Sequence, residues 1–393
     1  MTIYMTMEIA KDIKEQLCAL RRDFHMHPEI SGQEKETAKR VVAELRKLDG
    51  ITIKENMGGY GVVATLKGAK PGKTVALRAD MDALQITEEN DVCYKSQNGG
   101  VMHACGHDNH MTIVLGAAHL LAAHRQELCG EVRFIFQPAE ELSPKGGSRS
   151  MIEAGALEGT DAVFGLHVWP DLPMGTIGCK TGSLMAASDH FSVTINGRSS
   201  HAAKPEDGID AIVVGAQFVN GVQTIISRRT DPLKSAVVTI GRFNAGTRYN
   251  IIAETCEMEG TCRTLDEGVR DNIEQQLQKV LDGVCLMNGA TGTLNYERGY
   301  MAVINDAKMM EYARKTAIKL FGEQQVCNVE YPSMCAEDFA FYLAEKPGAF
   351  LWLGTGEKDS ENYPLHNSRF NIDEDILWRG AALLAQLALD FCD

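Results

Sequence analysis

The stretch EVRFIF at residues 131–136, followed by QPAEE at 137–141, decides the fold class of this chain. A short apolar run that ends in turn residues and acids is typical of a buried strand that leads into a loop. Comparable runs and helical patterns surround it. Strands are expected at 61–66, 74–77 and 162–166, and helices at 110–127 and 147–154. Strands that alternate with helices in this way predict an α/β sheet covered on both faces.

The pattern changes after residue 182. Residues 188–196 (SDHFSVTIN) alternate polar and apolar side chains, which indicates a half-exposed strand. The elements expected next are a helix at 208–228, strands at 235–243 and 255–264, a helix at 266–288 and a strand at 292–298. That βαββαβ order predicts an inserted α+β domain over 183–295. The α/β domain then comprises residues 1–182 and 296–393.

Two helices are expected near the N-terminus. Residues 8–24 place Ile9, Ile13, Leu17 and Leu20 at spacings of three and four, as an amphipathic helix does. Ser31 and Glu34 have the spacing of a capping box, so a second helix is expected from there to about residue 48.

Composition excludes several classes of protein. The 393 residues include 39 Lys and Arg against 53 Asp and Glu, a formal net charge of −14. This acidity argues against nucleic acid or an anionic membrane as the main partner. We found neither a secretory signal pattern nor a membrane-spanning run, and the eleven cysteines follow no disulfide framework. We therefore expect a cytoplasmic protein with reduced thiols.

The densest cluster of metal-binding side chains is HACGHDNH at residues 103–110. Cys105 and His107 project to the same side of an extended or turning backbone, and Gly106 lets the chain bend around an ion. Thiolate with imidazole suits Zn²⁺ or a similar divalent ion. The alternative is a buried Cys105 beside ordinary loop histidines.

Other expected strand exits carry further candidate ligands. Glu140 and Glu141 follow the strand at 131–136, His167 follows 162–166, and the pair Asp80 and Asp82 follows 74–77. His366 lies in a turn near the C-terminus. Each residue alone is weak evidence. Together with Cys105 and His107 they offer too many ligands for one tetrahedral zinc, and they fit two ions that share a ligand.

The motifs HACGHDNH, FQPAEE, GLHVWP, SHAAKPEDGID, SMCAEDFAFY and PLHNSRFNIDEDIL together resemble the M20 metallopeptidase and amidohydrolase family. Within it they are similar to the N-acyl-amino-acid amidohydrolases, which include hippurate and auxin-conjugate hydrolases. The likeness runs from about residue 20 to about residue 377. It implies two divalent ions per subunit, Zn²⁺ or Mn²⁺ with Co²⁺ or Ni²⁺ as alternatives. The ligands that it implies are Cys105, His107, Glu141, His167 and His366.

The resemblance also implies roles for other residues. Glu140 matches the general base, Asp80 a nearby acid, and His201 a histidine that reaches the substrate, often in the partner subunit's site. Asn250 and Arg263 match positions that contact the substrate carboxylate. The inserted domain matches a lid that commonly mediates homodimerisation. Arg78 stands where the wider family has a histidine, so metal binding depends on Cys105 instead.

The implied activity is cleavage of the amide bond of a small N-acyl amino acid. A dipeptidase or carboxypeptidase is the main alternative. A thiol hydrolase that uses Cys105 and a non-catalytic binder of small molecules are further alternatives. Two departures from the family pattern are Cys335, where glycine is usual, and the loop LSPK at 142–145. Neither changes a matched ligand.

Overall fold

The computed structural model describes residues 12–358 and 361–392. The chain divides into two compact units. Unit 1 comprises Met1–Gly182, Ile304–Tyr331 and Asp338–Asp393, and unit 2 comprises Ser183–Val303 and Pro332–Glu337. The expected boundary at 295/296 falls inside the last strand of unit 2, and the segment Pro332–Glu337 was not expected to belong to that unit.

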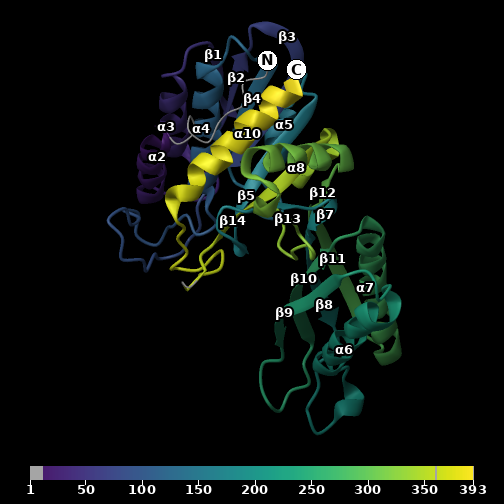
Figure 1. Cartoon of the computed structure of the whole chain (residues 1–393). Helices are drawn as coiled ribbons and strands as arrows, with labels where there is room; N and C mark the ends of the chain where they lie inside the picture. The colour runs from purple at the N-terminus through teal and green to yellow at the C-terminus, as the bar shows by residue number, and fades with distance from the viewer. Residues whose placement is uncertain (1–11, 359–360, 393) are drawn as a thin grey trace. The chain divides into compact units, whose positions relative to one another are not determined.

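Unit 1 is built on an eight-stranded mixed sheet (Figure 1). In spatial order its strands are β1 (Ile51–Met57), β2 (Gly61–Lys67), β4 (Cys129–Gln137), β3 (Lys70–Asp80), β5 (Ala162–Pro173), β14 (Gly348–Gly356), β6 (Ile177–Cys179) and β13 (Val326–Asn328). The four central strands, β4, β3, β5 and β14, are parallel to one another. Consecutive residues of β5 and β14 are buried, so both faces of these strands are covered. The expected α/β class is confirmed.

The helices of unit 1 pack on this sheet and on one another. They are α2 (Lys14–Met26), α3 (Lys35–Leu45), α4 (His107–Ala123), α5 (Ser148–Glu153), α8 (Ala307–Phe321), α9 (Ala340–Glu345) and α10 (Leu377–Cys392). In Figure 1, α10 crosses in front of the sheet next to α8. Helices α4 and α10 approach closely because small residues meet there. A Cβ on Gly116 would lie 2.8 Å from the Cβ of Ala381.

Unit 2 has the expected βαββαβ order. Its elements are β8 (Ala187–Asn196), α6 (Ala211–Arg229), β9 (Ala236–Ala245), β10 (Thr255–Thr264), α7 (Glu267–Asn288) and β11 (Thr291–Tyr300). The strands form an antiparallel sheet in the order β11-β8-β10-β9. Every second residue of β8 and β10 is buried, and Phe191 and Met258 belong to the core shared with the two helices. Asp210 and Asp266 cap the helices, each through a side chain that accepts a backbone N–H bond.

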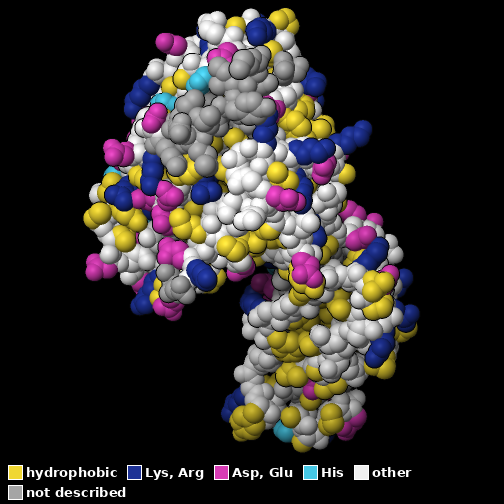
Figure 2. Space-filling model, in the orientation of Figure 1, with side chains coloured by type: hydrophobic (Ala, Val, Ile, Leu, Met, Phe, Trp, Pro, Cys, Tyr) yellow, Lys and Arg dark blue, Asp and Glu magenta, His cyan; other side chains and the backbone are white. Residues whose placement is uncertain are grey.

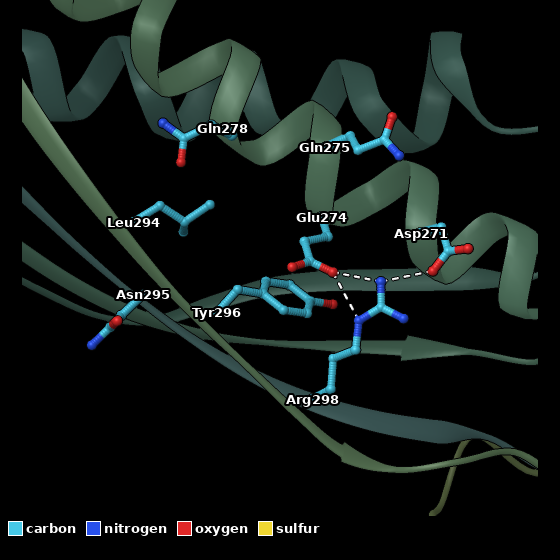
Figure 3. Close-up of a pocket in the computed structure, with 8 residues that line it drawn as sticks. All are labelled: Asp271, Glu274, Gln275, Gln278, Leu294, Asn295, Tyr296 and Arg298. Atoms are coloured by element: carbon cyan, nitrogen blue, oxygen red, sulfur yellow. Dashed lines mark hydrogen bonds and ion pairs between the residues drawn. The ribbon is translucent and has the colours of Figure 1, made fainter.

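A polar groove of about 660 Å³ lies between α7 and β11 of unit 2 (Figure 3). Its most prominent feature is Arg298, which bonds to both Asp271 and Glu274. None of the residues that line it is a predicted site residue. A short two-stranded sheet pairs β7 (Gly182–Met185) with β12 (Val303–Asn305). Within the described ranges, no helix is both long and apolar enough to cross a membrane.

Two expectations near the N-terminus need comment. Residues 8–11 of the expected first helix, including Ile9, lie outside the described residues, and α2 begins at Lys14. The predicted capping box is wrong. Helix α3 begins at Lys35 with no side-chain cap bond from Glu34, and Glu29 instead accepts the N–H of Thr37 in its first turn. The side chains of Ser31 and Glu34 are bonded elsewhere.

Candidate metal centre

The expected metal ligands of unit 1 converge at the carboxyl end of its parallel strands. Strand β3 ends at Asp80, β4 leads into Glu140 and Glu141, and β5 carries His167. Such an edge is where α/β proteins place their sites. The possible ligand atoms lie within 4.8 Å of one another in each of three groups: Cys105, His107 and His167; Cys105, Glu141 and His366; and His107, Glu140 and Glu141. The groups share members, as expected for two neighbouring ions with a common ligand.

The turn that carries Cys105 and His107 depends on Gly106. This glycine has φ of +91°, in the left-handed region, and it precedes the first residue of α4. A Cβ at this position would lie 2.4 Å from Cγ2 of Val168. Only glycine satisfies both conditions, so the sequence Cys-Gly-His places the thiol and the imidazole side by side at the start of the helix.

Backbone carbonyls orient two of the imidazole rings. Nδ1 of His107 lies 2.8 Å from the carbonyl oxygen of Asp82, and Nδ1 of His167 lies 2.6 Å from that of Val168. A carbonyl only accepts, so each Nδ1 carries a proton, and Nε2 is the nitrogen left for a metal ion. Nε2 of His167 lies 3.4 Å from the Cys105 sulfur. This is the tautomer that a metal ligand requires.

One ligand atom in the cluster is buried without a hydrogen-bond partner. Among the described residues, Nε2 of His107 has none, although such atoms are normally satisfied. It lies 4.0 Å from Oε1 of Glu141, too far for a hydrogen bond. Thiolate, imidazole and carboxylate donors together suit Zn²⁺ and related ions. The side chains present therefore fit the metals that the sequence predicts.

Backbone strain is concentrated beside the paired glutamates and at His366. Ala139, which precedes Glu140, has φ of +56°, and His366 has φ of +65°. Residues other than glycine rarely adopt this region, and such strain clusters at functional sites. Nε2 of His366 lies 3.2 Å from Oε1 of Glu141, and the backbone N–H of His366 donates to the carbonyl of Ala104. Both strained residues therefore place a carboxylate or an imidazole in the cluster.

The electrostatics of the cluster favour cations. Burial alone would lower the pKa of His107, but the carboxylates of Asp80 and Asp82 outweigh it and raise that pKa to about 10. Burial and the neighbouring Glu141 raise the pKa of the Cys105 thiol well above its ordinary value. A thiol in this environment is not an activated nucleophile, which argues against the thiol-hydrolase alternative.

Asp80 is completely buried behind the ligands. Its carboxylate accepts bonds of 2.7 Å from Arg78 and from Nδ1 of His110, and it lies 3.8 Å from Nε2 of His107. Despite burial, His107 and Arg78 hold the pKa of Asp80 well below its ordinary value. Arg78 also bonds to Asp338, at 2.8 Å. Arg78 thus supports the site through its bonds to Asp80 and Asp338.

Sequence reasoning gave no role to His110 or Asp338 and considered Asp82 only as a candidate ligand, yet all three organise this site. Asp82 accepts the backbone N–H groups of Glu140 and Glu141, at 3.1 and 2.9 Å. His110 links Asp80 to the backbone N–H of Val168, and Asp338 donates its backbone N–H to Glu140. In the sequence, Asp82 could have been found from the alternation of charged residues at 78, 80 and 82, at the end of an apolar strand and just beyond it.

The three predicted substrate residues lie in unit 2, at two different ends of its sheet. Ser200 and Ile252, with Ala202 and Asn250, continue the β8–β10 pairing past Asn196, which places His201 beside Asn250. Arg263 pairs with Ser188 at the other end, eight residues along the strand from Thr255, or about 26 Å at 3.3 Å per residue. A small substrate cannot contact both His201 and Arg263 of the same chain.

Comparison with known proteins identifies relatives along the whole chain. The profile of Peptidase family M20/M25/M40 matches residues 76–390. N-acetylcysteine deacetylase of Bacillus subtilis is 40% identical over 379 residues, 96% of this chain and 97% of the relative. Thermostable carboxypeptidase 2 of Saccharolobus solfataricus is 40% identical over 384 residues, 97% of this chain and 96% of the relative.

A solved structure agrees with the fold. The YXEP protein of Bacillus subtilis, described as a dinuclear metal-binding peptidase of the M20 family, matches with a TM-score of 0.85 and 38% identity. The match covers 97% of this chain and 98% of that one.

Proposed function

Since the chain belongs to peptidase family M20/M25/M40, we propose that it is a metal-dependent amidohydrolase that cleaves N-acyl amino acids into a carboxylic acid and a free amino acid. The observation that carries this proposal is the convergence of Cys105, His107 and Glu141 with two further imidazoles, beside a second buried glutamate. Family relatives include a deacetylase of an N-acyl amino acid, which supports this substrate class.

Two divalent ions per subunit are proposed, held by Cys105, His107, Glu141, His167 and His366. Zn²⁺ and Mn²⁺ are the first candidates, and Co²⁺ and Ni²⁺ the next. When bound, such ions supply Lewis acidity, which lowers the pKa of a water molecule and polarises a carbonyl group. Cys105, His107 and Glu141 each belong to two of the ligand groups, so these three side chains would lie closest to both ions.

Glu140 is the proposed general base. Its carboxylate is buried at the edge of the cluster, where it takes a proton from the attacking water and returns it to the amide nitrogen as the C–N bond breaks. The backbone N–H of Asp338 donates to Oε1 of Glu140, at 3.3 Å, which helps to fix the position of the carboxylate. Asp80 acts through His107 and His110, whose positions it holds.

Unit 2 is proposed to act as a lid and as the surface through which two chains form a homodimer. Most of the large exposed apolar side chains belong to it, among them Val213, Phe243 and Ile251, and apolar side chains cover much of its visible face in Figure 2. Exposed apolar area of this kind marks interaction surfaces. In a dimer, Arg263 of one chain and His201 with Asn250 of the other would contact one substrate. One small substrate could then reach all three residues, although they lie far apart within a single chain.

A cytoplasmic location is proposed on the evidence of the thiols. All eleven cysteines are free, and nine of them are buried or half-buried. Thiols persist in reducing compartments.

The test of the proposed function is a substrate panel. The metal-free protein is reconstituted with Zn²⁺, Mn²⁺, Co²⁺ or Ni²⁺ and assayed on N-acetyl, N-benzoyl and indole-acyl amino acids, with dipeptides as the comparison set. We expect metal-dependent release of the free amino acid from at least one N-acyl substrate, at higher kcat/KM than from any dipeptide. Preference for dipeptides would favour the carboxypeptidase alternative. No hydrolysis of either class would refute the proposal.

Replacing Glu140 by Gln tests the general base. We expect the Glu140→Gln protein to bind metal normally and to lose turnover by a factor of about 100 or more, because general-base catalysis is typically worth 10²–10⁴. Elemental analysis measures the metal and a stopped assay measures kcat. Full activity in this variant would remove Glu140 from its role.

A further inference from the structure

The loop that carries the paired glutamates is held by two buried carboxyl groups. Three successive backbone N–H groups, those of Ala139, Glu140 and Glu141, all donate to acids. Asp82 accepts the last two. The N–H of Ala139 donates to Oε1 of Glu34, at 2.8 Å, from a residue 105 positions earlier in the chain. The orientation of both glutamates therefore depends on where these two acids lie.

Glu34 belongs to the start of α3 but does not serve that helix. Its side chain is completely buried, and Oε1 accepts the N–H of Gly32 as well as that of Ala139, both at 2.8 Å. Its other oxygen, Oε2, is buried with no hydrogen-bond partner in the part of the chain that the structure describes. A buried, partly unsatisfied carboxyl group is costly for the fold, so a contribution elsewhere must offset it.

Ser31 completes the arrangement. Its hydroxyl donates to Oδ2 of Asp82 at 2.6 Å, the oxygen that also accepts the N–H of Glu141. The backbone brings the two segments together, because Ala83 donates its N–H to the carbonyl of Glu29 and Ile30 forms a bridge with Ala83. The two side chains with capping-box spacing are thus both directed at the loop of the catalytic glutamates.

We infer that Glu34, assisted by Ser31, is a positioning residue for the general base, which fixes the strained turn at Ala139 and thereby aims the carboxylate of Glu140. This inference rests on the proposed function. Ala139 has φ of +56°, a conformation that the chain keeps only where its surroundings impose it. Glu34 accepts the N–H of Ala139 at 2.8 Å, whereas the carbonyl of Ala139 accepts a longer bond of 3.4 Å from the N–H of Leu142. Without the bond to Glu34 the turn at Ala139 relaxes. The carboxylate of Glu140 is then no longer held in its orientation, although the fold persists.

The test compares two replacements of nearly equal size. Glu34→Gln keeps a carbonyl oxygen that can accept both N–H groups, and Glu34→Met removes the acceptor. Glu36→Gln is the matched control, because Glu36 is exposed on the same helix and bonds only to Lys39 among the contacts found. Each protein is assayed with an N-acyl amino acid at saturating metal, and metal content and thermal unfolding are measured alongside.

For Glu34→Met we expect kcat to fall by a factor of about 10–100, the loss expected from a small misplacement of a catalytic group, with KM and saturating metal content nearly unchanged. Glu34→Gln should keep kcat within a few-fold of the wild type. Wild-type kcat in a folded Glu34→Met protein, or equal losses in both variants, would overturn the inference. A purely structural role would lower the unfolding temperature without this difference between Gln and Met.

Ser31→Ala decides the question if the Glu34→Met protein fails to fold. It removes only a half-buried hydroxyl, and we expect a lower kcat at unchanged KM. An unchanged kcat would overturn the inference. An inactive wild type on every N-acyl substrate would instead refute the proposed function, so the two failures are distinguishable.

Discussion

Cys105 is the residue on which the metal centre depends most. Arg78 lies two positions before Asp80. Its guanidinium donates hydrogen bonds to Asp80, Gln137 and Asp338 and has no lone pair for a metal. The thiol faces Nε2 of His167 at 3.4 Å and belongs to two of the ligand groups. Its sulfur is therefore a proposed ligand that no neighbouring side chain can replace.

Removal of that sulfur should lower the metal content. We expect the Cys105→Ala protein, dialysed against buffer with trace metal, to retain about one ion or fewer per chain, since removal of a ligand weakens binding strongly. Elemental analysis gives the ratio, and Cys93→Ala, an exposed cysteine, is the control. Wild-type stoichiometry in Cys105→Ala would count against thiolate ligation.

The pH dependence of the free energy of unfolding should show the raised pKa of Glu34. Burial and the nearby Asp82 raise the pKa of Glu34 to about 7, so the folded protein holds this proton more tightly than the unfolded chain does. The resulting stabilisation is complete below the ordinary pKa of about 4.3 and disappears as the pH rises through about 7. Glu34→Gln has no such proton to lose.

We therefore expect the free energy of unfolding of the metal-free wild type to fall relative to that of Glu34→Gln between pH 4.5 and 7.5, by roughly 3 kcal/mol. Urea unfolding at several pH values measures the difference. A difference that stays constant over this range would show that Glu34 titrates normally.

Residue types and spacing predicted which side chains lie together in the proposed metal centre, because ligand chemistry is local. Cys105 and His107 are two positions apart, and Glu141 and His167 follow strands whose carboxyl ends had to meet. The supporting residues could not be predicted in this way. Asp82, His110 and Glu34 act through hydrogen bonds to segments far away in the chain, and only the folded structure brings those segments together.

At the scale of elements, the start of α4 and the turn before it place two of the five proposed ligands. The helix was expected at 110–127 and begins earlier, at His107, directly after the turn at Gly106. The βαββαβ order of unit 2 was predictable from the alternation of polar and apolar residues in its strands and from the helical patterns between them. The capping box was not, because Ser31 and Glu34 have the right spacing but their side chains bond to a different loop.

Gly106→Ala tests how far the site depends on this turn. The added Cβ would meet Val168 at 2.4 Å and would force a left-handed conformation on alanine. We expect a loss of about 2 kcal/mol or more in unfolding free energy, together with weaker metal binding. Gly99→Ala is the control, since a Cβ there has no atom within 4 Å. Equal behaviour of the two variants would show that the turn is not constrained.

At the scale of the whole molecule, the proposed homodimer implies a site to which two chains contribute. Each subunit would supply its own metal ligands from unit 1, and His201 of one chain would serve the site of the other. If so, a subunit that lacks Glu140 and a subunit that lacks His201 should complement each other.

Mixing Glu140→Gln with His201→Ala subunits, after exchange, should restore about a quarter of the wild-type activity, because half of random dimers are mixed and each mixed dimer has one complete site. Each variant alone should be nearly inactive. Mixtures that stay inactive would place His201 in its own chain's site, and full activity of His201→Ala alone would place it outside catalysis.

The proposed metal centre requires that five side chains distant in sequence hold a pair of divalent ions beside Glu140. Anomalous diffraction from crystals of the Zn²⁺- or Mn²⁺-loaded protein, recorded at the metal's absorption edge, locates such ions. We expect two peaks per chain, both bounded by Cys105, His107, Glu141, His167 and His366. A single peak, or peaks outside this set of residues, would refute the proposed centre.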